Sequence, residues 1–301
     1  MQQMTAKERI TAALEGWEVD HLPFCPFLAY IWESFPQAMQ DEGQLAFHQR
    51  IGADPLWRGA PCPVRAVLPD VQIRRVEDDA HILEETTTPV GTLRQQWIKS
   101  RAGNTSFLVE HPLKRKEDFK IMLWLEEHTR FELDLGPFRE HMAGPGAEGL
   151  SIGMLLPRAK SAYQSMVEST VGTEELIYAL SDYPDTVETL WRAMVENDLR
   201  AAQLAMEADY TYYITWEDSG TQNYSPTLYE RYIGAEIREW CALLAGDGRR
   251  YIQHACGHVR GLLTHMRADG RHAVESISPP PTGNITLREA RELLGSGVGI
   301  I

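Results

Sequence analysis

The sequence is poor in cysteine and in long apolar runs. It has four cysteines in 301 residues, and its first sixteen residues are polar and amphipathic, without the apolar centre of a signal peptide. Scattered cysteines without a secretion signal are typical of reduced thiols, so we predict a cytoplasmic protein. No apolar run approaches the roughly 18 residues of a membrane span, which argues against a membrane role.

Basic residues are also scarce. The chain has 29 lysines and arginines against 43 aspartates and glutamates, a formal net charge of −14. A nucleic-acid surface needs a basic stripe, so we expect no nucleic-acid partner, and a polyanionic substrate is disfavoured for the same reason. The 43% apolar and 24% charged shares are ordinary for a globular protein of a length that buries a sizeable core.

No GxGxxG motif follows the first expected strand, which argues against a doubly wound dinucleotide-binding fold. Short apolar strands instead alternate with amphipathic helices at spacings near 40 residues in the second half of the chain, as in parallel βαβ units. We expect seven core strands, near residues 20–29, 52–57, 149–157, 210–218, 249–257, 272–278 and 297–301. The pattern predicts an α/β protein with a (β/α)8 TIM-type barrel that lacks its last strand and helix.

Residues 1–301 show no convincing linker and are expected to form a single barrel domain. Near 71–98 the pattern changes to alternating β-branched residues with a Pro-Val-Gly turn, which predicts a β-hairpin excursion. Thr5 with Glu8, and Thr286 with Glu289, match capping boxes and predict two helix starts.

The pair His254 and Cys256 ends the strand expected at 249–257. Residues two apart on a strand point to the same side, and the active site of such a barrel lies at the carboxyl ends of its strands. An imidazole and a thiolate together suit zinc. The alternative is a buried thiol beside a hydrogen-bonded histidine, and the spacing alone leaves both interpretations open.

Three carboxylates near expected strand ends are further candidates. Asp218 follows a strand of aromatic residues and is the candidate for substrate contact or acid–base catalysis; a capping or loop role is the alternative. Glu217 is expected to be its more exposed neighbour. Glu168 follows the third expected strand and either reaches the barrel mouth or lies on a surface helix. Glu275 sits in the strand expected at 272–278.

Several aromatic residues are candidates for lining a flat apolar substrate site. Tyr30, Trp32, Tyr213 and Trp216 lie in or near expected strands, and ordinary barrel core is the alternative for each. The candidate substrate-binding set is therefore Tyr30, Trp32, Trp216 and Glu217.

The chain resembles the uroporphyrinogen decarboxylase superfamily, most closely its zinc-dependent corrinoid methyltransferase branch. The resemblance covers nearly the whole chain and is specific through the order of its segments rather than through any one of them. The segments are TAKERITAALEGWEVDHLPF (5–24), GTEELIYALSDYPDTVETL (172–190), WEDSGTQNYSPTLYERYI (216–233), HACGHVRGLL (254–263) and VESISPPPTGNITLREARELLGSGVGII (274–301).

The resemblance implies a (β/α)8 barrel and a zinc site. In the methyltransferases the ligands are a histidine and a cysteine of an H-x-C motif and a cysteine near the carboxyl terminus, so His254 and Cys256 carry over as ligands. The segment expected to bring the eighth strand and the late cysteine is missing from this sequence, so we expect either a truncated chain or another third ligand. Glu168 is the candidate for that third ligand.

The resemblance also implies a function. We expect a zinc-dependent methyltransferase that moves a methyl group between a small thiol, methoxy or methylamine compound and a corrinoid, the methylcobalamin being supplied by a partner corrinoid protein. The oligomeric state is left open, a homodimer included. Two alternatives remain: a metal-free decarboxylase, and a non-catalytic binding protein of the same fold. Residues 24–36 contain no arginine, so a porphyrinogen with many carboxylates is poorly served.

Overall fold

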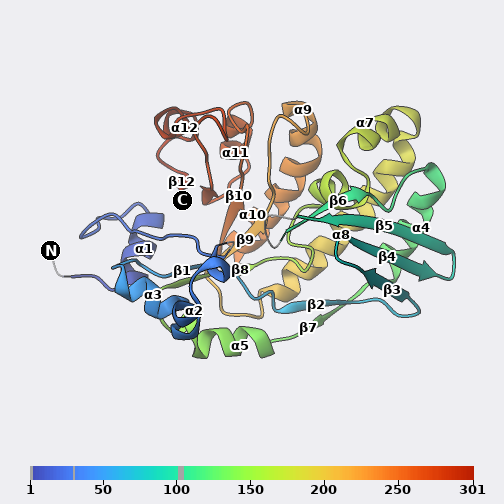
Figure 1. The fold of residues 1–301 in the computed structure, drawn as a ribbon. Helices are drawn as coiled ribbons and strands as arrows, with labels where there is room; N and C mark the ends of the chain where they lie inside the picture. The colour runs from blue at the N-terminus through green and yellow to red at the C-terminus, as the bar shows by residue number, and fades with distance from the viewer. Residues whose placement is uncertain (1–2, 30, 101–104) are drawn as a thin grey trace.

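A six-stranded parallel sheet forms the centre of the computed structural model, which describes residues 3–29, 31–100 and 105–301. The sheet curls into an open half-barrel, so the fold agrees with a TIM-type barrel without being a complete eight-stranded one (Figure 1). In spatial order its strands are β1 (Leu56–Ala60), β8 (Leu150–Met154), β9 (Tyr212–Trp216), β10 (Arg250–His254), β11 (Ala273–Glu275) and β12 (Gly299–Ile300).

The expected strand at 20–29 is wrong, which is why the sheet has six strands in the described residues and not seven. Pro23 and Pro26 supply no amide hydrogen for a strand ladder. The segment runs as irregular backbone and is fixed through Asp54 instead. The amide of Phe24 donates to the Asp54 carboxylate at 3.1 Å, and the amide of Asp54 donates to the Phe24 carbonyl at 2.7 Å.

Most helices lie between successive strands along the chain, whereas α1, α2 and α3 precede β1 and α1 contributes Ile10 to the core of the strand residues. Both predicted capping boxes are present, at the starts of α1 and α12. The helices are α1 (Ala6–Leu14), α2 (Gln37–Glu42), α3 (Gln44–Arg50), α4 (Lys116–His128), α5 (Gly136–Ala143), α6 (Ala162–Ser165), α7 (Thr173–Asp182), α8 (Pro184–Ala205), α9 (Pro226–Leu228), α10 (Ala235–Gly246), α11 (Leu263–Ala268) and α12 (Leu287–Leu294). Short 3-10 turns span Trp32–Ser34 and Pro145–Ala147, and π-helical turns span Met166–Thr170 and Tyr229–Gly234.

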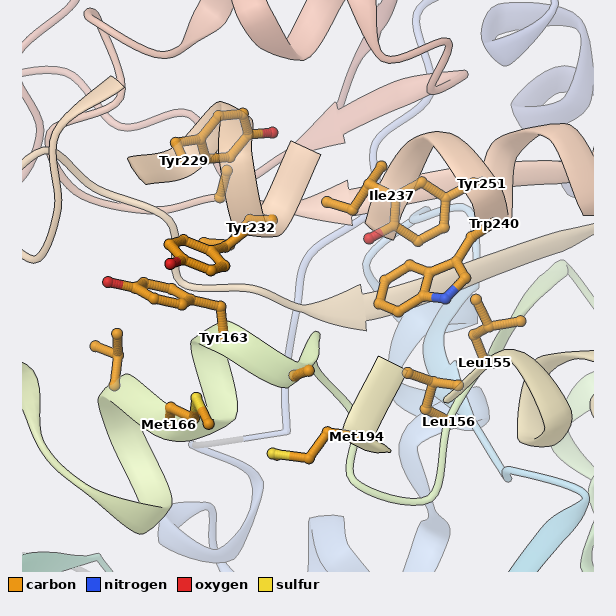
Figure 2. Close-up of a cluster of buried hydrophobic side chains, with 14 of the residues drawn as sticks. Leu155, Leu156, Tyr163, Met166, Met194, Tyr229, Tyr232, Ile237, Trp240 and Tyr251 are labelled. Carbon is orange, nitrogen blue, oxygen red and sulfur yellow. The ribbon is translucent and has the colours of Figure 1, made fainter. Parts of the chain in front are cut away.

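Two apolar cores hold this architecture. The larger lies between the sheet and its helices, where the stacked rings of Tyr163 and Tyr232 lie 4.6 Å apart (Figure 2). Trp240 of α10 and Tyr251 of β10 meet edge-on in the same core. The smaller core fills the inside of the curl and is built from alternate strand residues, among them Ile152. The polar residues at the carboxyl ends of the strands therefore lie against this tightly packed apolar core.

The predicted hairpin is part of a larger antiparallel sheet that lies beside the half-barrel (Figure 1). Its four strands are β3 (Gln72–Glu77), β4 (His81–Thr88), β5 (Gly91–Lys99) and β6 (Ser106–Glu110). A separate two-stranded ribbon pairs β2 (Val64–Val67) with β7 (Arg130–Leu133). None of the helices in the described ranges is long and apolar enough to cross a membrane.

Candidate metal centre

Three donor side chains converge at the carboxyl ends of β9 and β10. His254 is the last residue of β10, Cys256 follows two residues later, and Asp218 lies two residues beyond β9. The Asp218 carboxylate lies 3.1 Å from His254 Nε2, and Cys256 Sγ donates a hydrogen bond to the same carboxylate oxygen at 3.2 Å. Asp218 takes a positive φ of 40°, which is uncommon for a residue with a side chain and is a form of strain found at functional sites.

The spacing of these donors fits a zinc ion. One nitrogen, one sulfur and one carboxylate oxygen lie within 4.8 Å of one another, and within the described ranges they are the one group of this kind. Zinc takes such donors at about 2.0 to 2.3 Å in tetrahedral geometry, which places ligand atoms roughly 3.3 to 3.7 Å apart. The two separations from the Asp218 oxygen, 3.1 Å and 3.2 Å, are slightly shorter than this, and all three donor atoms lie within 4.8 Å of one another. Zinc sites with three protein ligands leave a fourth position open for a substrate.

The other nitrogen of His254 is already engaged. Nδ1 contacts the Glu275 carboxylate, whose second oxygen accepts from the Arg58 guanidinium. The Glu275 side chain is buried, with 3% exposed, and the Arg58 side chain is 11% exposed. Each ring nitrogen of His254 thus faces a carboxylate, Nδ1 that of Glu275 and Nε2 that of Asp218. A neutral ring that donates from Nδ1 to Glu275 leaves the Nε2 lone pair free toward Asp218 and Cys256. Nε2 is therefore the nitrogen available to a metal.

Glu168 lies near the centre but outside the three-donor group. Its carboxylate accepts from the Lys160 ammonium group and from the Gln164 amide. Lys160 also reaches toward Asp218, with 3.6 Å between Nζ and the carboxylate oxygen that does not face His254. The third donor in the structure is Asp218, a residue singled out from the sequence for substrate contact or catalysis. Lys160 follows β8 in a loop without a recognisable motif and was not anticipated.

The charges of the site set its protonation in the absence of metal. Burial, together with the nearby Asp218 carboxylate, raises the pKa of the Cys256 thiol to about 12. Burial opposes ionisation of Asp218, but the hydrogen bond and charge of His254 and the charge of Lys160 outweigh it and lower the pKa of that carboxyl. Burial raises the pKa of Glu168, although Lys160 opposes this. A bound cation would reverse the balance at the thiol.

Glu217 is not the exposed neighbour that the sequence suggested. Its side chain is fully buried behind the site, where both carboxylate oxygens accept hydrogen bonds. One accepts from the Ser161 amide at 2.8 Å and from Thr215 Oγ1 at 2.7 Å, and the other accepts from Ser161 Oγ at 2.6 Å. The carboxylate thus fixes the loop after β8 to the end of β9 and does not face the donor group.

The aromatic candidates lie in different places. The Trp216 ring meets the His254 ring edge-on, with 5.2 Å between centroids, and Phe27 lies 6.3 Å from the same indole. The sequence analysis did not single out Phe27 as a neighbour of Trp216. Trp32 packs with the Phe35 and Phe47 rings. Tyr213 is fully buried in the core, as its alternative interpretation held, and Tyr30 lies outside the described residues.

The fold resembles that of a known methyltransferase. The chain superimposes on the methyltransferase from Methanosarcina mazei with a TM-score of 0.56 and 14% sequence identity, over 99% of this chain and 82% of that chain. At that identity the likeness concerns the fold alone. No protein-family model matches the chain, and no curated protein matches it in sequence.

Proposed function

We propose that this protein is a zinc-dependent methyltransferase that moves a methyl group between a small substrate and a corrinoid carried by a partner protein. The observation that carries the proposal is the convergence of Asp218, His254 and Cys256 donor atoms within 4.8 Å at the strand ends. The likeness in fold to a methyltransferase and the sequence resemblance to the corrinoid branch support the choice of reaction.

In this proposal, His254 Nε2, Cys256 Sγ and Asp218 hold the ion and leave one position open to the substrate. Zinc supplies Lewis acidity there, which stabilises a substrate thiolate or polarises a methoxy oxygen. Trp216 covers one edge of the His254 ring and keeps water from that side of the centre. The Lys160 ammonium group pairs with the Asp218 oxygen that faces away from His254, and this ion pair orients the other carboxylate oxygen toward the ion.

The charge around the site favours a small, weakly charged substrate. Both nearby cations are already paired with acidic groups. Lys160 is paired with Glu168 and Asp218, and Arg58 is paired with Glu275. Neither is left to neutralise a polycarboxylate, and the chain as a whole carries a net charge of −14. This supports methyl transfer over decarboxylation of a porphyrinogen.

The direct test combines metal content with turnover. Purified wild type should hold about one zinc per chain, and His254→Ala and Cys256→Ser should hold much less, because two remaining donors bind zinc weakly. With free methylcobalamin standing in for the corrinoid protein and a small thiol as acceptor, wild type should remove the methyl group and both variants should fall to the uncatalysed rate. Cys62→Ser is the matched control, a partly buried thiol outside the donor group.

Other outcomes select the alternatives. Zinc content in wild type no higher than in both variants contradicts the proposal. Carbon dioxide release from uroporphyrinogen at an enzymatic rate would favour the decarboxylase. Tight zinc binding with no methyl transfer to several thiols, and none from methoxy or methylamine donors, would favour a binding protein.

A further inference from the structure

Glu275 and Arg58 form a largely buried pair of charged residues behind the proposed metal ligand His254. Glu275 lies opposite His254 in the parallel register of β10 and β11, so their side chains emerge side by side. One oxygen of Glu275 contacts His254 Nδ1, and the other accepts from Arg58, which reaches across the inside of the curled sheet from β1. Each carboxylate oxygen thus has one charged or polar partner.

We propose that Glu275 and Arg58 are positioning residues that set the ring orientation and the proton location of His254. This inference rests on the proposed zinc site. A metal-binding histidine is commonly oriented by a carboxylate on its other nitrogen. Here the carboxylate is itself prevented from rotating, because Arg58 fixes its second oxygen and packs its own guanidinium 4.1 Å from the Phe27 ring centroid.

The geometry distinguishes this role from a simple support of the fold. An ion pair that only supported the fold would not need to contact His254 as well. Replacing a buried ion pair with apolar residues is often neutral for stability. In this arrangement the chain Arg58–Glu275–His254 ends on the atom that faces Asp218 and Cys256. Loss of the carboxylate frees the ring to rotate and permits the tautomer with the proton on Nε2, which cannot bind a cation.

The test measures zinc affinity by competition with a chelator and the visible spectrum of the protein loaded with cobalt(II). Glu275→Gln keeps the size of the side chain but offers Nδ1 a weaker acceptor, and zinc affinity should fall about 10- to 100-fold. Arg58→Met keeps the carboxylate but releases it, so the loss should be smaller. Both variants should change the cobalt spectrum, because it reports ligand geometry.

Asp269→Asn is the matched control. Asp269 is a buried carboxylate paired with buried Arg271 outside the donor group, so the variant should lower stability while zinc affinity stays within about twofold of wild type, well short of the outer-shell effect. If Glu275→Gln fails to fold, the double variant Arg58→Met with Glu275→Gln removes both buried charges and carries the same expectation.

Wild-type zinc affinity and cobalt spectrum in a folded Glu275→Gln or double variant overturn the inference and leave the proposed function standing. A wild type that binds no zinc overturns both.

Discussion

Gly59 has no side chain in the place where the Trp216 indole lies. A Cβ built on Gly59 would stand 2.6 Å from Trp216 Cζ2, and the residue has a φ of +73°, which disfavours a side chain regardless of space. Gly59→Ala should therefore lower the free energy of unfolding by about 2 kcal/mol or more, since left-handed strain alone costs 1–3 kcal/mol. Urea unfolding followed by circular dichroism measures the loss.

The same variant should also disturb the site, because the displaced indole loses its contact with the His254 ring. Gly246→Ala is the control: Gly246 ends α10 and has no atom within 4 Å of an added Cβ, so the change should be neutral or slightly stabilising. Equal stability of the two variants would show that the Trp216 position tolerates the added methyl group.

At the scale of single residues, the sequence predicted side-chain positions that follow from alternation within one strand. His254 and Cys256 were expected on the same side of β10, and their donor atoms do converge. The contribution of Asp218 depends on the register between β9 and β10, in which Trp216 lies opposite His254. Asp218 and Cys256 each lie two residues further along and therefore also come close together. Register between strands is not written in the sequence of either one. The position of Glu168 likewise depends on Lys160, from a loop without a motif.

The loop after β8 carries Lys160 to the site and is fixed by buried acids. Ser161 is the N-cap of α6, and its hydroxyl also donates to the buried Glu217 carboxylate at 2.6 Å. Ser161→Ala should lower the free energy of unfolding by about 3 kcal/mol, the sum of a lost cap and a buried carboxylate left without one donor. Chemical denaturation of the variant gives the value.

Ser225→Ala is the control for that element, because Ser225 caps the exposed start of α9 and contacts no buried acid. It should cost about 1 kcal/mol, the ordinary value for a cap. If both serine variants lose the same stability, then Glu217 does not depend on the Ser161 hydroxyl, and the loop has another anchor.

Elements with local signals were predictable from the sequence. The two capping boxes begin helices because the side chains that satisfy the free amides lie within three residues of one another. The segment 20–29 was apolar enough to suggest a strand, yet its two prolines prevent one. The hairpin was recognisable from its turn, and β3 lies within the alternating stretch at 71–98, whereas β6 lies beyond that stretch and depends on its pairing with β5.

The whole molecule should be most stable in mildly acidic solution. Burial raises the pKa of Asp198 to about 7, although the nearby Arg158 opposes this. The folded protein then binds a proton there that the unfolded chain, with a pKa near 3.8, releases, so stability falls as pH rises from about 4 to 7. At the acid end, hydrogen bonds from Thr286 and Arg260 lower the pKa of Glu289 to about 2, and its contribution is lost as pH falls below about 4.

Urea unfolding at a series of pH values from 3 to 9 tests this. Wild type should lose stability between about pH 4 and pH 7, and Asp198→Asn, which cannot ionise, should lose less over the same range. Glu126 and Glu236 also face this cluster, so part of the slope should remain in the variant. Parallel curves for the two proteins would assign the slope to other groups.

The contact between Arg58 and Glu275 joins residues 217 positions apart. A ribosome adds about 5–20 residues per second, so Arg58 is made roughly 10 to 40 s before its partner. During that interval Glu275, the partner that Arg58 has in the folded protein, is not yet made, and burying the guanidinium without it would cost free energy. We therefore expect β1 to stay hydrated in the nascent protein until β11 is synthesised, so that the candidate metal centre is one of the last parts of the molecule to form.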